Sequence, residues 1–169
     1  YIEVGGIERV TLADPYFSVK SAAKLLGRIS SADVELNIIT ALLSTDPDTG
    51  EKHTNIKEEC KTFINRYKNT LHTNLTITNV LHGNNQAFHD RYLIRYFEDG
   101  HIDGFLLSNS LNSAGQSFPF VIAPLEFEVC LEVAEYLQNL VDMEYQNMLP
   151  IKEQNQVEIL YQPTKDRED

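Results

Sequence analysis

The hydrophobic and polar positions of the chain switch between strand-like and helix-like patterns. Short β-rich runs at 9–13, 34–43 and 75–81 predict strands, the second of them buried on both sides. Apolar residues at helical spacing predict amphipathic helices over 18–30 and 54–72, between these strands. This order is typical of a mixed α/β sheet with helices packed on it.

The second half of the chain reads mainly as strands. Residues 88–97 and 102–108 carry strand-like runs on either side of Glu98-Asp99-Gly100, which predicts a β-hairpin. The pattern beyond it predicts three further elements, namely a strand at 126–133, a helix at 134–149 and an edge strand at 157–161.

The length of the chain supports one domain. Its 169 residues are enough to bury one hydrophobic core and too few for two of ordinary size. We expect the domain over residues 1–150, and an edge strand with a polar tail over 151–169. Because the chain begins at Tyr1 rather than Met, we expect it to be part of a longer protein with further domains.

Cysteine usage and hydropathy favour a cytoplasmic location. Cys60 and Cys130 lie 70 residues apart without a Cys-x-x-Cys pair, which predicts two free buried thiols rather than a disulfide framework or a zinc site. No apolar run approaches the roughly 18 residues of a membrane span, so we expect no membrane segment.

The charge of the chain is uneven. Fourteen Lys and Arg against 25 Asp and Glu give a formal net charge of −11, which argues against a protein that holds nucleic acid by bulk charge. Residues 96–151 contain nine acids and no Lys or Arg, whereas residues 51–95 contain seven basic and four acidic side chains. We therefore expect a confined, salt-sensitive anion site in the middle of the chain, which a uniformly acidic surface there would argue against.

The stretch from residue 88 to residue 112 contains the candidate chemistry. Alternate residues of a strand share a face, so the predicted strand places His89 and Arg91 where both reach one anion. The imidazole can attack phosphorus or transfer a proton, and the guanidinium can bind two phosphate oxygens. Ser110 and Asn112 share a face at the end of the partner strand and would donate hydrogen bonds to the same oxygens.

A carboxylate is expected to hold the second ring nitrogen of His89 and to fix its tautomer. Glu126 and Glu128 alternate on the strand predicted at 126–133, and we favour Glu128 for this role.

Simpler interpretations of the two arginines remain open. The simpler interpretation of Arg91 is an ion pair with Asp90 or Asp14. Arg95 either contacts a nucleic-acid backbone or faces solvent.

These residues together resemble the phospholipase D superfamily. Its signature is H-x-K-x4-D, a hairpin, G-S-x-N and a later glutamate, and the counterparts here are His89-Asp90-Arg91, Asn109-Ser110-Leu111-Asn112 and Glu128. The runs VTLADPYFS and VELNIITAL are also similar to the family's first two strands, so the resemblance covers residues 7–150. It implies an α/β fold with a phospholipase D-like mixed β-sheet flanked by helices on both faces.

Three positions depart from the signature. Arg91 stands where the family has lysine, Tyr96 stands at the aspartate position, and Asn109 replaces the glycine. Arginine keeps the positive charge but differs from lysine in reach and geometry.

The resemblance implies a phosphodiesterase that uses neither a metal nor another cofactor. His89 would form a phosphohistidine, while Arg91, Ser110 and Asn112 neutralise the phosphoryl oxygens and Glu128 orients His89. The family needs a second copy of the motif to protonate the leaving oxygen. We therefore expect either a homodimer through the active-site face or a second motif elsewhere in the parent protein.

Nucleic acid is the expected substrate, DNA before RNA, because small single-motif members of the family are often nucleases and the chain shows no membrane-facing segment. A role in bacterial antiviral defence is a further expectation from analogy. One alternative is an inactive copy used for dimerisation or nucleic-acid binding. Another is a phosphodiesterase acting on a lipid or a small molecule.

Overall fold

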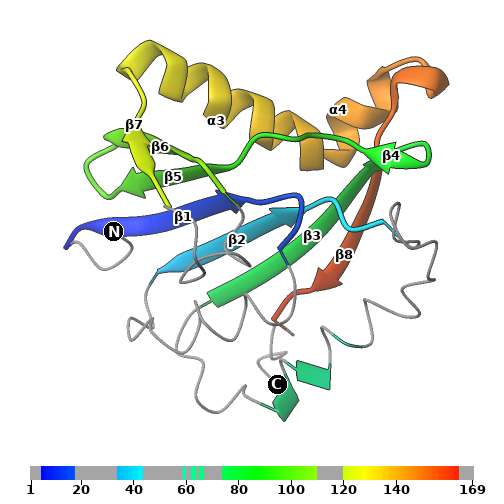
Figure 1. Ribbon diagram of the computed structural model, residues 1–169, viewed down its shortest axis with the longest axis horizontal. Coiled ribbons are helices and arrows are strands. Elements are labelled where there is room, and N and C mark those ends of the chain that lie inside the picture. The colour runs from blue at the N-terminus through cyan, green and yellow to red at the C-terminus, as the bar shows by residue number, and fades with distance from the viewer. Residues whose placement is uncertain are drawn as a thin grey trace, which may run out of the picture.

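The computed structural model of the chain describes residues 5–17, 34–43, 59, 62–63, 65–66, 74–109 and 120–163. These residues form a mixed α/β fold built on an open eight-stranded sheet with helices α3 and α4 (Figure 1). The strands are β1 (Ile7–Ala13), β2 (Glu35–Thr40), β3 (Asn74–His82), β4 (Asn85–Gln86), β5 (Tyr92–Phe97), β6 (Ile102–Leu107), β7 (Ile122–Pro124) and β8 (Gln156–Tyr161). The helices are α3 (Phe127–Val141), α4 (Met143–Met148) and a 3-10 turn at Ile151–Glu153.

The strand order places several chain segments at one edge of the sheet. The order is β4-β3-β2-β1-β5-β6-β7, and β8 pairs with β3. Strands β1, β2 and β3 are parallel, β5 is antiparallel to β1, and β6 is antiparallel to β5. The carboxyl ends of β1, β2, β3 and β6 therefore meet the beginning of β5. This edge positions the candidate site.

The two faces of the sheet hold two separate hydrophobic clusters, because alternate residues of a strand point to opposite faces. Val10, Leu12, Leu36 and Ile38 belong to the first cluster, and Phe63 packs against it. The second cluster lies under α3 and contains Ala13, Ile39, Ile94, Cys130, Leu137 and Leu140. Each fully buried leucine of these clusters contributes about 1.5–3 kcal/mol to stability.

The expected helix over 18–30 lies outside the described residues. Within the expected helix over 54–72, the described residues are helical, and Phe63 reaches the first cluster. Strands predicted at 9–13, 75–81, 102–108 and 157–161 are confirmed within one or two residues.

The prediction of a strand at 126–133 is wrong, because these residues belong to α3. The alternating apolar residues that suggested a strand are on the exposed side of the helix: Phe127 is 52%, Val129 44% and Leu131 43% exposed. The buried residues Cys130 and Leu137 are seven apart, two helical turns, and Glu128 favours the first turn through the helix dipole.

The strand predicted at 34–43 was expected to be buried on both faces, and the structure shows this for only part of its length. Leu36, Ile38 and Ile39 are buried, but Glu35 is exposed and Asn37 is half-buried. Strand β2 is therefore covered by α3 only toward its carboxyl end.

Gly104 lies where α3 packs closely on β6. A Cβ at this position would lie 2.7 Å from Ile94 Cδ1 and 2.8 Å from Cys130 Sγ. We expect Gly104→Ala to lower the free energy of unfolding by about 1–3 kcal/mol through overpacking, measured by urea denaturation. Gly5→Ala, where a Cβ meets no atom within 4 Å, is the matched control. Equal stability of the two variants would contradict this packing.

Arg95 occupies neither of the positions considered from the sequence. It is buried and paired across the hairpin with Asp103, which accepts hydrogen bonds from Arg95 Nε at 2.8 Å and from Nη2 at 2.5 Å. The guanidinium also lies 5.0 Å from the Phe105 ring centre. Arg95 is therefore a structural residue of the sheet rather than a solvent-exposed or backbone-binding cation.

Asp103→Ala would leave the buried Arg95 charge without this partner. We expect the substitution to lower the free energy of unfolding by about 2–4 kcal/mol. Glu98→Ala, which removes an exposed acid from the turn of the same hairpin, should change it by less than about 0.5 kcal/mol. Chemical denaturation of both variants tests this, and an Asp103→Ala variant as stable as the control would show that the ion pair contributes nothing.

Candidate functional site

The segment His89-Asp90-Arg91 enters β5 at the sheet edge where β1 and β6 end. The predicted strand at 88–97 begins later than expected, at Tyr92. His89 and Arg91 are therefore on a connecting segment, and strand alternation does not fix their relative orientation. The backbone still joins this segment to β6, because the Leu107 N–H donates to the Arg91 carbonyl oxygen at 2.9 Å.

Arg91 is paired with Asp14, one of the two simpler partners considered from the sequence. Arg91 Nε lies 3.8 Å from Asp14 Oδ1, and the guanidinium carbon lies 5.2 Å from the Tyr16 ring centre. The Asp14 side chain is fully buried, whereas that of Arg91 remains 22% exposed. Arg91 Nε has no hydrogen-bond partner among the described residues.

Asp14 is held firmly at the end of β1. Its N–H donates to the Ile39 carbonyl oxygen at 3.0 Å, and its Oδ1 accepts from the Tyr16 N–H at 3.1 Å. A buried carboxylate needs a positive or hydrogen-bonding partner. Asp14 thus attracts Arg91 by charge, without a hydrogen bond to Nε, while part of the Arg91 side chain stays exposed.

Ser110 and Asn112 lie outside the described residues. The chain leading to them is fixed as far as Ser108, whose Oγ accepts from the Val121 N–H at 2.9 Å. The Ser108 N–H also donates to the Val121 carbonyl oxygen at 3.0 Å. Since β6 ends beside the segment that contains Arg91, Ser110 follows two residues after this anchored position.

Glu126 and Glu128 lie at the beginning of α3 and are exposed. Neither lines the cavity that His89 borders, and the α3 carboxylate that does is Glu132. Sequence reasoning missed Glu132 because it placed residues 126–133 on a strand. Helical spacing puts Glu132 one turn after Glu128, which is the signal that would have found it.

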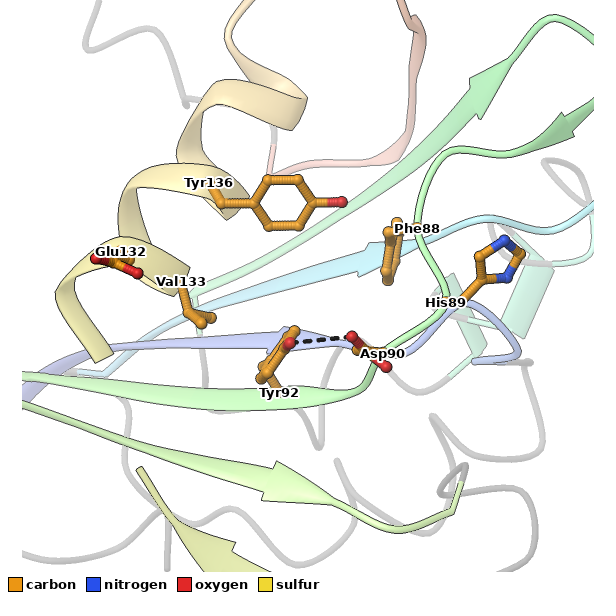
Figure 2. Close-up of a pocket in the computed structure, with 7 residues that line it drawn as sticks. All are labelled: Phe88, His89, Asp90, Tyr92, Glu132, Val133 and Tyr136. Atoms are coloured by element: carbon orange, nitrogen blue, oxygen red, sulfur yellow. Dashed lines mark hydrogen bonds between the residues drawn. The ribbon is translucent and has the colours of Figure 1, made fainter. Parts of the chain in front are cut away.

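A cavity of about 330 Å³ lies between α3 and the segment that leads into β5. Figure 2 shows His89 at its rim, with the ring directed away from the other lining side chains. The lining residues are Phe88, His89, Asp90, Tyr92, Glu132, Val133 and Tyr136. They include two carboxylates and no Lys or Arg, so the α3 side of His89 is acidic.

The two phenols of this cavity are shifted toward their protonated form. Burial raises the pKa of Tyr92, and the charge of Asp90 and a hydrogen bond to it raise this pKa further. Burial and Asp90 likewise raise the pKa of Tyr136. The Tyr92 hydroxyl donates to Asp90 Oδ2 at 3.2 Å (Figure 2). Both phenols are therefore hydrogen-bond donors at neutral pH.

A larger cavity of about 700 Å³ lies over the amino-terminal half of β1, β2 and β3. Thr11, Asn37 and Thr76 are neighbours in register on its floor, and Arg9 lies at one side, with its guanidinium carbon 3.9 Å from the Tyr96 ring centre. This groove shares no lining residue with the cavity beside His89.

No family model matches the chain, and a search of curated proteins found no match.

Three further observations concern the described residues. None of their helices is long and apolar enough to cross a membrane. They contain no group of three or more His, Cys, Asp or Glu side chains that could hold a metal ion. Cys130 is a free, buried thiol, as expected, and burial raises its pKa; Cys60 is not among the described residues.

Proposed function

We propose that the chain is a phospholipase D-like phosphodiesterase domain that hydrolyses nucleic acid. The observation that supports this most is the position of Arg91. It follows His89 by two residues, contacts the buried Asp14, and adjoins the end of β6, from which Ser110 and Asn112 follow. The order of strands at this edge is compatible with the expected phospholipase D-like sheet, which has helices on both faces.

The proposed reaction has two displacement steps. A ring nitrogen of His89 attacks the phosphorus, a P–N bond forms, and the P–O bond to the leaving group breaks. The leaving oxygen takes a proton from the His89 of a second subunit, which the expected homodimer supplies across its two-fold axis. Water then attacks the phosphorus, the P–N bond breaks, and a phosphomonoester is released.

Arg91 would stabilise the negative charge that builds up on the phosphoryl oxygens in both steps. A guanidinium that the charge of Asp14 already attracts to this edge has less to reorganise during the reaction, which would make its stabilisation more effective. Ser110 and Asn112 would add neutral donors. Glu128 does not take the orienting role expected from the sequence, because it is exposed at the start of α3 and does not line the cavity that His89 borders.

Two observations favour the alternative of an inactive copy. The aspartate position of the motif is occupied by Tyr96, which is half-buried beside α3 and lies against Arg9. The acidic lining beside His89 also weakens binding of a second phosphate on that side. An inactive domain would still form a dimer and bind nucleic acid without cleaving it.

Cleavage in the presence of EDTA separates these two functions. We expect the chain to cleave single- or double-stranded DNA or RNA at an EDTA concentration that removes all divalent metal, and to sediment as a dimer. Cleavage should decline steeply with salt, because phosphate contacts release counterions. A dimeric protein that binds but does not cleave any of these substrates would support the inactive copy. A strict monomer would leave His89 without the second histidine that the mechanism needs.

A further inference from the structure

The cavity beside His89 combines flat apolar walls with hydrogen-bond acceptors. Phe88, Tyr92 and Tyr136 supply aromatic surface, and Val133 completes the wall on α3 (Figure 2). Asp90 and Glu132 supply carboxylates. Arg91 is not part of this lining and contacts Asp14 and Tyr16 instead. Arg91, the group suited to bind phosphate, therefore lies outside the acidic and aromatic cavity.

The lining restricts which chemical groups can enter. Two carboxylates disfavour an anion, so a phosphate of the substrate belongs on the Arg91 side. Asp90 accepts one hydrogen bond from Tyr92, and a carboxylate offers about four acceptor positions, so it can accept further donors. The aromatic side chains favour a flat ring that stacks on them. The fitting group is therefore planar and presents N–H donors at its edge.

We propose that this cavity binds an unpaired nucleobase next to the scissile phosphate, with a preference for guanine. This inference rests on the proposed nuclease function. The N1–H and N2–H₂ groups of guanine are adjacent donors that one carboxylate can accept together, and the Tyr136 hydroxyl can donate to O6 while the Tyr92 hydroxyl donates to Asp90. Adenine and cytosine present a single amino group at this edge, and uracil and thymine a single imino group.

This geometry also specifies the form of the substrate. A base inside a duplex is stacked and paired on its edge, so it can reach Asp90 only in a single strand or after leaving the helix. The domain should therefore cleave single-stranded nucleic acid better than the matching duplex. Stacking on aromatic side chains tolerates any base, whereas the carboxylate discriminates among them.

Cleavage of single-stranded oligonucleotides that differ only in the base beside one cleavable phosphate tests the proposal. We expect kcat/KM to be at least tenfold higher with guanine than with uracil or thymine, or with an abasic site. Asp90→Asn retains an acceptor for Tyr92 but removes the charge, and should reduce this preference to less than threefold. Tyr136→Ala should lower kcat/KM for every base and leave the abasic substrate unaffected. Glu135→Gln, an exposed acid of α3 that does not line the cavity, should behave like the parent.

A second measurement distinguishes this inference from the proposed function. Titration of the full chain with guanosine, uridine and choline, followed by NMR, should shift signals of Tyr136 and Val133 with guanosine more than with the other two. If the chain cleaves all substrates equally and Asp90→Asn changes nothing, the base-binding inference is wrong while the nuclease function stands. If no substrate is cleaved, the nuclease function fails. Shifts with choline alone would overturn the inference, because they would identify a cation site.

Discussion

Replacing His89 with alanine should lower EDTA-resistant cleavage by about 10³-fold or more. The variant loses both the nucleophile and, in a homodimer, the acid that protonates the leaving oxygen. His89 is exposed and lies on a connecting segment rather than in the core, so the variant should remain folded. Initial rates for parent and variant under single-turnover conditions measure the effect.

A second histidine provides the control for this experiment. His101 is exposed in the β5–β6 turn, at the opposite end of the hairpin from His89. His101→Ala should retain parental activity within about twofold. If His89→Ala cleaves like the parent, or if both variants lose activity equally, His89 is not the nucleophile.

Arg91→Ala should lower kcat/KM by about 10²–10³-fold, the usual effect of removing a preorganised charged donor. Arg91→Lys should recover part of this loss, since it keeps the charge but not the two-pronged geometry. Lys152→Ala, which removes a surface cation that is 83% exposed, serves as the matched control and should leave kcat/KM unchanged.

Asp14 allows a sharper test of how Arg91 acts. In Asp14→Asn the guanidinium remains but loses the charged partner that attracts it to this edge. We expect a smaller loss, about tenfold, that appears mainly in kcat rather than in KM. The double variant Asp14→Asn/Arg91→Ala should be no worse than Arg91→Ala alone, because Asp14 acts through Arg91. Additive losses would show that Asp14 has a separate role.

The parts of the fold that the sequence predicted are those encoded by local pattern. Runs such as LNIIT in β2 and LTITNVL in β3 are short and rich in aliphatic and β-branched residues, and both are strands. The run from Phe127 to Val133 misled the same reasoning, because its exposed apolar residues imitate a strand. Only the later residues Leu137 and Leu140 reveal a helical buried face.

Pairwise contacts between side chains of different strands could not be predicted from the sequence. The partnership of Arg95 with Asp103 depends on the register of the hairpin, which a two-residue shift would change. The contact between Arg91 and Asp14 joins residues 77 positions apart and was only one of two options. The cavity beside His89 could not be predicted, because it requires Tyr136 and Glu132 to lie on one face of a helix that was placed too late in the chain.

The fold shows where two of the acidic residues after Tyr96 lie and what they contact. The acids after Tyr96 are not confined to solvent: Asp103 neutralises Arg95, and Glu132 lines the cavity beside His89. The cavity beside His89 contains the carboxylates of Asp90 and Glu132, and Arg91 lies outside this lining and pairs with Asp14.

Detection of a covalent intermediate on His89 would show directly whether His89 is the nucleophile. A substrate with ³²P at the scissile phosphate is mixed with excess chain, quenched in base at intervals within the first turnover, and digested for mass spectrometry. We predict an acid-labile phosphoramidate on the peptide that contains His89, formed and lost at the rate of cleavage and absent from His89→Ala. Cleavage without label on His89, or label on another residue, would contradict the account.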